Sequence, residues 1–200
     1  MAGMSERELM VDPKTTALVL IDLQRGITGR SVAPHSAQEV VANCARLADR
    51  FRALGAPVVL VRVSFAQDGR DRLAPPVDAP MQGLATPMPG WDELVPEIGP
   101  REGDLVVIKR QWGAFYGTDL DLQLRRRSVN TIIMGGIATN MGVESTARDA
   151  YERGYAQILV EDAMASLSAE AHAFAVTTIF PRLARVRSTD QVLAALGSIS

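Results

Sequence analysis

The chain has 200 residues, of which 47% are hydrophobic and 22% are charged, and its formal net charge is −2. This composition suits one domain, residues 1–200, with a full core, and the near-neutral charge argues against a nucleic-acid or anionic-membrane surface. No stretch reaches the ~18 continuous apolar residues of a membrane span, and the start of the chain lacks the apolar core of a signal peptide, so we expect a cytoplasmic protein.

The first predicted element after an N-terminal tail, residues 1–14, is a buried strand at 17–21 that stops at Asp22. Next comes a helix at about 37–54, because Ser36 and Glu39 have the spacing of a capping box and apolar residues recur at steps of three and four. Cys44 lies on that apolar stripe. We therefore expect a packed core cysteine and not a nucleophile.

A second strand is predicted at 57–64, and the amino-acid composition of the chain changes after it. Residues 66–103 contain seven of the eleven prolines beside several glycines, with one weak helical pattern near 91–98. Such a long Pro/Gly-rich loop is either a lid or partner contact or an irregular connection, and the sequence leaves both readings open.

The third predicted strand, 105–108, is an apolar run that ends at Lys109, and the fourth, 131–134, leads into a glycine-rich loop at 135–142. Thr118 and Asp121 suggest the cap of a short helix between these strands. The remaining predicted elements are helices at about 142–153, 169–179 and 189–196 and strands at 155–161 and 184–187.

This alternation of strands and helices predicts an α/β fold with three layers, α/β/α, around a six-stranded, mostly parallel sheet in the Rossmann-like order 3-2-1-4-5-6. Strands one and four flank the point where the winding of such a sheet reverses. Asp22 and the loop before Gly142 should therefore lie side by side at the carboxyl edge of the sheet, with Lys109 at the same edge.

Asp22 and Lys109 are the candidate catalytic residues. An aspartate at the tip of a buried strand is desolvated, which raises its pKa toward that of a useful proton donor, whereas a nearby ammonium has the opposite effect. The sequence leaves the protonation state of Asp22 open. The plain alternatives are an aspartate that caps the next loop and a solvated lysine.

Three segments carry a resemblance to a known family: 21–24 (IDLQ), 109–118 (KRQWGAFYGT) and 136–147 (GIATNMGVESTA). In this order and at these elements they resemble the isochorismatase-like hydrolases, over about residues 15–196. Most of that family are cysteine hydrolases, in which an aspartate as at Asp22 and a lysine as at Lys109 activate a cysteine after strand four. The matching position here is Gly142, so the resemblance implies that the covalent route to amides is closed.

Two further comparisons with the family narrow the activity that we expect of this chain. Nicotinamidases bind zinc through histidines after strand two, and residues 64–71 contain none. A smaller branch, the true isochorismatases, also has glycine at this position and hydrolyses a vinyl ether without a protein nucleophile. In that reading Asp22 is the proton donor, and Lys109 places the acid and binds the substrate. Gln111 stands where that branch has an arginine, which argues against isochorismate itself as the substrate.

The resemblance and the chemistry of the residues also predict how the substrate is held. We expect substrate contacts from seven residues: Gln24, Trp112, Phe115, Ile137, Ala138, Met141 and Gly142. Amide groups at 141–143 would attract an anion at a helix start. The resemblance further implies a non-proline cis peptide at Ile137–Ala138, and core packing is the alternative for Phe115.

The leading interpretation is a hydrolase of a small molecule that uses non-covalent acid catalysis. Two alternatives are a ligand-binding or scaffold protein that keeps the pocket and a C–N hydrolase that activates water on Asp22. We expect no cofactor and no metal, because Gly135–Gly136 is not a dinucleotide fingerprint and His35 and His172 alone offer little for a zinc site. A homo-oligomer, dimer or tetramer, is expected from the resemblance alone.

Overall fold

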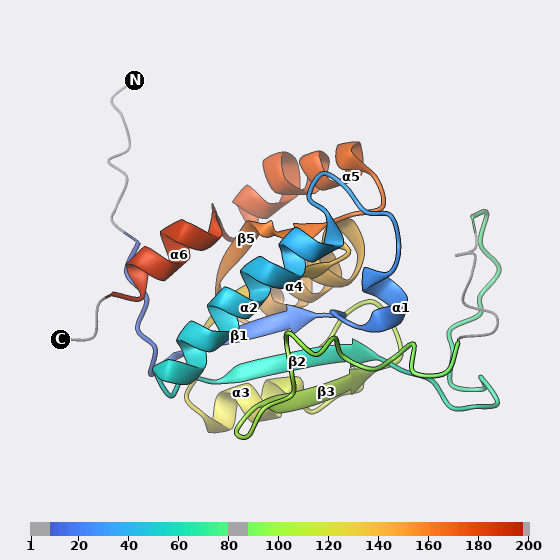
Figure 1. Cartoon of the computed structure of the whole chain (residues 1–200), viewed down its shortest axis with the longest axis horizontal. Coiled ribbons are helices and arrows are strands. Elements are labelled where there is room, and N and C mark those ends of the chain that lie inside the picture. The colour runs from blue at the N-terminus through green and yellow to red at the C-terminus, as the bar shows by residue number, and fades with distance from the viewer. Residues whose placement is uncertain (1–8, 80–87, 198–200) are drawn as a thin grey trace.

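The computed structural model describes residues 9–79 and 88–197 and is built around one six-stranded parallel sheet (Figure 1). The strand order is β3-β2-β1-β4-β5-β6, as predicted. The strands are β1 (Thr16–Ile21), β2 (Val58–Val63), β3 (Leu105–Lys109), β4 (Thr131–Ile137), β5 (Ala156–Ala165) and β6 (Arg185–Arg187). Ile21 is in register with Val61 of β2 and Gly136 of β4, so β1 ends one or two residues before its two neighbours do.

Helices cover both faces of the sheet, which confirms the three-layer α/β architecture (Figure 1). The helical elements are α1 (Arg25–Thr28), α2 (Ala37–Ala53), α3 (Leu120–Arg126), η1 (Thr139–Val143), α4 (Glu144–Glu152), α5 (Ala169–Phe174), η2 (Ala175–Ile179), η3 (Phe180–Arg182) and α6 (Thr189–Ala195). Helices α2 and α6 pack on one face, and α3 and α4 pack on the other.

The core consists of two clusters, one on each side of the sheet. Leu18 and Leu20 of β1 belong to the cluster under α2, whereas Val19 and Ile21 belong to the cluster under α3 and α4. This split follows from the period of two in a strand, and it explains why a strand that is buried on both faces has a continuous apolar sequence. Both clusters support the carboxyl end of β1, where Asp22 follows.

The predicted start of α2 is confirmed. The amide of Glu39 donates to the Ser36 hydroxyl over 3.2 Å, and the Glu39 carboxylate accepts from the Ser36 amide over 2.8 Å. Cys44 is fully buried on the inner stripe of this helix, and its thiol donates to the carbonyl of Ala163 over 3.4 Å. Burial raises the pKa of this thiol well above its usual value, which confirms the interpretation of Cys44 as a core residue.

Three details predicted for the helices and strands differ in the structure. α3 begins after Asp119, and the predicted cap is only half formed: the Thr118 hydroxyl accepts from the Leu120 amide over 3.2 Å, whereas the Asp121 carboxylate accepts from the Tyr155 hydroxyl. β3 is an edge strand of the sheet that leaves Val106 and Ile108 exposed, so it is not buried on both faces. The helix expected from Gly142 begins instead with the π-helical turn η1, and α4 follows from Glu144.

The long loop at 66–103 is described except for residues 80–87, and its described residues form neither a strand nor the weak helix expected near 91–98. Its second half packs on the fold: Val95 and Ile98 are buried in the core, and the Trp91 ring stacks on Phe65 with centroids 5.8 Å apart. The N-terminal tail is described only from residue 9. Among the described helices, we find none with the length and hydrophobicity needed to span a membrane.

Candidate active site

Asp22 is the first residue beyond β1, and its backbone is held in an unusual conformation. Its φ is 54°, in the left-handed region that aspartate tolerates better than most residues. The Asp22 amide donates to the carbonyl of Val61 over 2.8 Å, and its carbonyl accepts from the Gln24 amide over the same distance. These bonds turn the chain sharply and leave the carboxyl group buried at the sheet edge.

Lys109 reaches this carboxyl group from the end of β3, across the end of β2. Its ammonium lies 2.8 Å from Oδ2 of Asp22 and donates to the carbonyl of Trp112 over 2.5 Å. Both side chains are almost completely buried. The other oxygen, Oδ1 of Asp22, is buried and has no hydrogen-bond partner within residues 9–79 and 88–197.

Two opposing effects set the pKa of Asp22. Burial is the larger effect and raises the pKa, because the ionised carboxylate loses its hydration. The charge and hydrogen bond of Lys109 and, to a smaller extent, the nearby backbone amide of Val63 lower it, but they compensate only in part. The protonated form is therefore populated at higher pH than for an exposed aspartate, which resolves in direction a question that the sequence left open.

Gly142 faces this pair from the π-helical turn η1. A Cβ atom at Gly142 would lie 3.1 Å from Oδ2 of Asp22, 3.1 Å from Nζ of Lys109 and 3.0 Å from Cγ2 of Ile21. These contacts are tighter than most real Cβ contacts, so a side chain here would push the pair aside. The three residues that the sequence assigned to one edge thus meet within contact distance.

The loop between β4 and α4 has the expected cis peptide at Ile137–Ala138. The carbonyl of Ala138 accepts hydrogen bonds from the amides of Met141 and Val143 over 3.1 and 3.2 Å. Two of the amides expected to attract an anion are therefore already engaged. Thr146 fixes the same turn, because its hydroxyl donates to the carbonyl of Gly142 over 2.6 Å.

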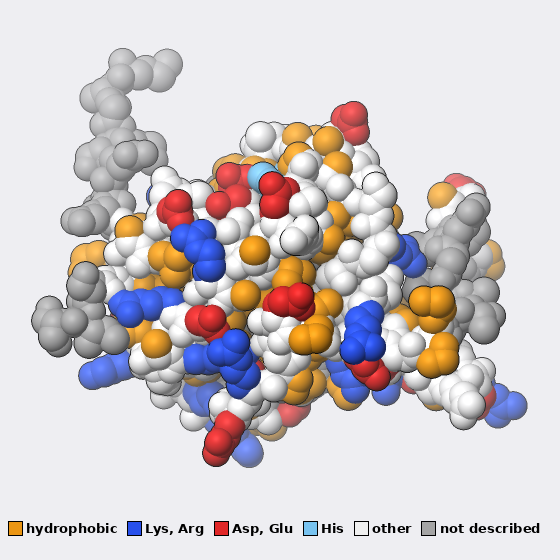
Figure 2. Space-filling model, viewed as in Figure 1, with side chains coloured by type: hydrophobic (Ala, Val, Ile, Leu, Met, Phe, Trp, Pro, Cys, Tyr) orange, Lys and Arg blue, Asp and Glu red, His pale blue; other side chains and the backbone are white. Residues whose placement is uncertain are grey.

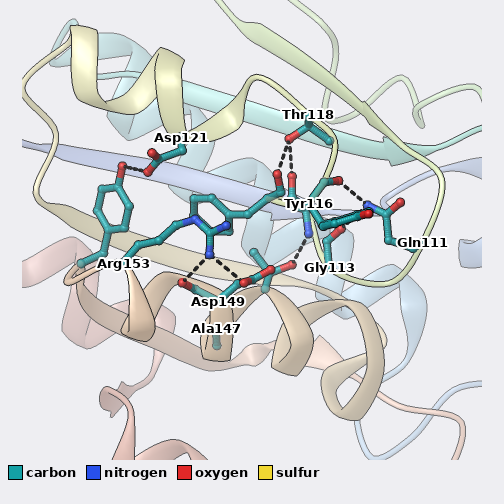
Figure 3. A network of polar contacts seen from close by, with 12 residues as sticks. Gln111, Gly113, Tyr116, Thr118, Asp121, Ala147, Asp149 and Arg153 are labelled. Carbon is teal, nitrogen blue, oxygen red and sulfur yellow. Dashed lines mark hydrogen bonds and ion pairs between the residues drawn. The ribbon is translucent and has the colours of Figure 1, made fainter.

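Polar contacts other than the Asp22–Lys109 pair hold the segment that follows β3 in place (Figure 3). The Gln111 side-chain amide donates to the carbonyls of Gly113 and Tyr116 over 2.9 and 2.7 Å. The Thr118 hydroxyl donates to the carbonyl of Ala114 over 2.6 Å, and Arg153 pairs with Asp149 over 2.7 Å. Gln111 thus shapes its own loop through its side chain.

The other residues that are predicted to contact the substrate differ in their burial and in their partners. The Gln24 amide is fully buried and bonds both backbone groups of Val63, so it joins the β1 end to β2. Trp112 is half exposed, whereas Phe115 is buried in the core beside Tyr155 with ring centroids 5.9 Å apart. This placement is the one that core packing predicts for Phe115, and its contact with a substrate stays a prediction. Met141 is partly buried against the α2 side of the core.

Other polar contacts next to this loop had no signal in the sequence. The Ser166 hydroxyl donates to Oδ1 of Asn140 over 2.5 Å, and the Thr139 hydroxyl lies 2.9 Å from Nδ1 of His172. These partners come from the end of β5 and from α5, so only the packed structure shows the pairs. Arg62 is engaged with Asp92 at 2.6 Å.

A three-layer α/β fold with a buried acid–lysine pair at the switch point of the sheet defines this protein as an α/β enzyme with its site at the carboxyl edge of the strands. The isochorismatase domain model matches residues 16–191. The chain therefore belongs to the isochorismatase family and is a hydrolase of that family.

Three relatives show how close this likeness is. The chain is 50% identical to YecD of Escherichia coli O157:H7, an uncharacterised isochorismatase family protein, over 94% of this chain and all of that protein. The solved structure of an isochorismatase family protein from Burkholderia thailandensis matches with a TM-score of 0.90 and 46% identity, over 94% of this chain and 98% of that one. RutB of Variovorax paradoxus, a ureidoacrylate amidohydrolase, is 30% identical over 82% of this chain and 73% of its own length.

Proposed function

We propose that this hydrolase cleaves a vinyl ether of a small molecule by acid catalysis at Asp22, without a covalent intermediate. The observation that carries the proposal is the state of the Asp22 carboxyl group. Oδ2 is engaged by Lys109, while Oδ1 is buried and has no partner in the described residues. Burial also raises the pKa, so the group is suited to hold a proton and deliver it.

The reaction proceeds in two balanced steps. The Asp22 carboxyl group gives its proton to the terminal methylene carbon of the vinyl ether, which leaves an oxocarbenium ion and an aspartate. Water adds to the cationic carbon and returns a proton to Asp22, and the resulting hemiketal collapses to a ketone and an alcohol. Only the acid and water take part in bond changes, so the reaction needs no protein nucleophile.

Lys109 and Gly142 have supporting roles in this proposal. Lys109 orients the carboxyl group through Oδ2 and stabilises the aspartate that forms after proton transfer. Gly142 corresponds to the position of the nucleophilic cysteine in the cysteine hydrolases. Because a Cβ here would lie 3.1 Å from Oδ2 of Asp22 and from Nζ of Lys109, a side chain at this position would shift the pair, and glycine leaves it undisturbed.

A second candidate is hydrolysis of a C–N bond by water that Asp22 activates as a base. It is favoured by the likeness to RutB, which is named a ureidoacrylate amidohydrolase. The raised pKa of Asp22 does not decide between the two candidates, because a raised pKa suits a general base as well as a general acid. A third candidate is a pocket that binds a ligand and catalyses no reaction.

The test is release of pyruvate from isochorismate and other enolpyruvyl ethers by the purified chain, with a panel of small amides and ureido acids in parallel. Asp22→Asn removes the proton donor and should lower turnover by at least about a hundredfold. Asp190→Asn, an exposed aspartate of α6, is the matched control and should keep full activity. Turnover that persists in Asp22→Asn would refute acid catalysis, and activity confined to the amide panel would favour the second candidate.

The expected dimer or tetramer remains a prediction. It is supported by the apolar side chains that edge strand β3 leaves exposed, Val106 and Ile108. A second copy would cover them, as edge strands in soluble proteins are commonly covered or charged.

A further inference from the structure

Three metal-ligating side chains meet on the far side of the loop that contains Gly142. His35 comes from the segment before α2, Glu161 from β5 and His172 from α5. One donor atom of each lies within 4.8 Å of the donor atoms of the other two. On the face shown in Figure 2, histidine and acidic side chains lie side by side at the surface.

The three residues differ in burial and in their present partners. Nε2 of His35 is 3.5 Å from a carboxylate oxygen of Glu161, and the two imidazole rings are edge to face with centroids 5.7 Å apart. His172 is buried, whereas His35 and Glu161 are about one-third exposed. An ion can therefore reach the cluster from solvent and meet one ligand that the core already holds in place.

The surroundings of His172 match those of a metal-binding histidine. Its Nδ1 is 2.9 Å from the Thr139 hydroxyl, which leaves Nε2 as the ring nitrogen that is not engaged with Thr139. Ligating histidines commonly have such a partner on the second nitrogen, which fixes the ring orientation.

The spacing is compatible with one small ion after a modest movement. Tetrahedral ligands about 2.0–2.2 Å from a zinc ion lie about 3.3–3.6 Å from each other, so donor pairs that are as much as 4.8 Å apart need to close by up to about 1.3 Å. The partly exposed His35 and Glu161 side chains can make this adjustment. Two imidazoles and one carboxylate also form a donor set that zinc and similar divalent transition metals favour.

We propose that His35, Glu161 and His172 form a binding site for a divalent transition-metal ion such as Zn²⁺, separate from the acid–lysine pair. No sequence pattern indicates this site, because the three ligands come from three distant segments. A bound ion would join the segment before α2 to β5 and α5. Through the contact of His172 with Thr139, it would also steady the turn that contains Gly142.

The experiment is titration of the full, tag-free, chelator-treated chain with Zn²⁺ by calorimetry, with Co²⁺ absorption as a second readout of ligand geometry. The chain has only two histidines and one cysteine, and Cys44 is buried, so few competing sites exist. We expect one ion per chain. His35→Ala and Glu161→Gln should each weaken binding by at least about a hundredfold, and Glu152→Gln, an exposed glutamate of α4, is the matched control.

Thr139→Val tests the orienting contact and should weaken binding by about tenfold. Circular dichroism of each variant shows whether it folds. If His172→Asn fails to fold, His35→Ala, on the partly exposed segment, decides the outcome alone. Binding far below one ion per chain, or equal affinity in His35→Ala and the unmodified chain, would overturn the proposal and leave His35 and Glu161 as an ordinary ion pair.

Discussion

The substitution Gly142→Ala tests whether the space beside the acid–lysine pair has to be empty. The added methyl carbon would lie 3.0–3.1 Å from Ile21 Cγ2, Asp22 Oδ2 and Lys109 Nζ, and real contacts of this kind are rarely so short. Relief requires a movement of a few tenths of an ångström by two buried charged groups. Because these groups hold each other at 2.8 Å, the movement disturbs the ion pair itself.

The expected loss of stability follows from two opposing effects. Overpacking of a filled site costs about 1–3 kcal/mol. Replacing glycine by alanine restricts the unfolded chain and returns about 0.4–1 kcal/mol. With mid-range values of about 2 and about 0.7 kcal/mol, the net loss is about 1.3 kcal/mol, which for a chain of this length lowers the Tm by about 3–5 °C. Misplacement of the acid should lower kcat/KM by roughly tenfold.

The assay is thermal unfolding together with turnover, and Gly113→Ala is the matched control. A Cβ at Gly113 would meet its nearest neighbour, Oδ2 of Asp149, at 3.4 Å, which is ordinary contact. The control should therefore change the Tm by no more than a surface substitution does. If Gly142→Ala behaves like Gly113→Ala in both stability and turnover, the space at Gly142 is not required and the reasoning fails.

Two further predictions concern buried titratable groups. Burial raises the pKa of Asp22, so between its ordinary and its raised pKa the folded chain binds more protons than the unfolded chain, and stability falls as pH rises through that window. In urea unfolding between roughly pH 4 and pH 7, the free energy of unfolding of Asp22→Asn should increase relative to that of the unmodified chain as pH rises. A difference between the two free energies that does not change with pH would count against the raised pKa of Asp22. Cys44, buried and with a raised pKa, should resist iodoacetamide in the folded chain and react after unfolding, as measured by mass spectrometry; rapid labelling of the native chain would contradict this.

The sequence predicts the sheet well because its signals are local and repeated. Apolar runs, a capping box at Ser36 and short crossovers are sufficient to place β1 beside β4 and to assign Asp22 and Gly142 to one edge. It could not show that Lys109 crosses the end of β2 to contact Asp22, because side-chain reach over a neighbouring strand depends on register and packing.

The errors have a common physical origin in tertiary contacts that compete with local patterns. Asp121 has the spacing of a cap, but the Tyr155 hydroxyl binds it from the adjoining chain segment. Phe115 lies close to Lys109 in the sequence, and the fold packs it in the core against Tyr155, so its contact with a substrate stays a prediction. His35 and His172 come from distant segments, and only the fold places Glu161 of β5 beside them, so the metal site proposed above has no pattern in the sequence.

The glycine at position 142 and the close approach of Asp22 and Lys109 are best understood as parts of one arrangement. A Cβ atom at position 142 would lie 3.1 Å from Oδ2 of Asp22 and 3.1 Å from Nζ of Lys109. A side chain there would have to move this pair by a few tenths of an ångström. With no side chain present, the lysine holds one carboxyl oxygen at 2.8 Å and leaves the other without a partner in the described residues. In the proposed acid chemistry the glycine therefore matters for the undisturbed position of the acid, and not only because it offers no nucleophile.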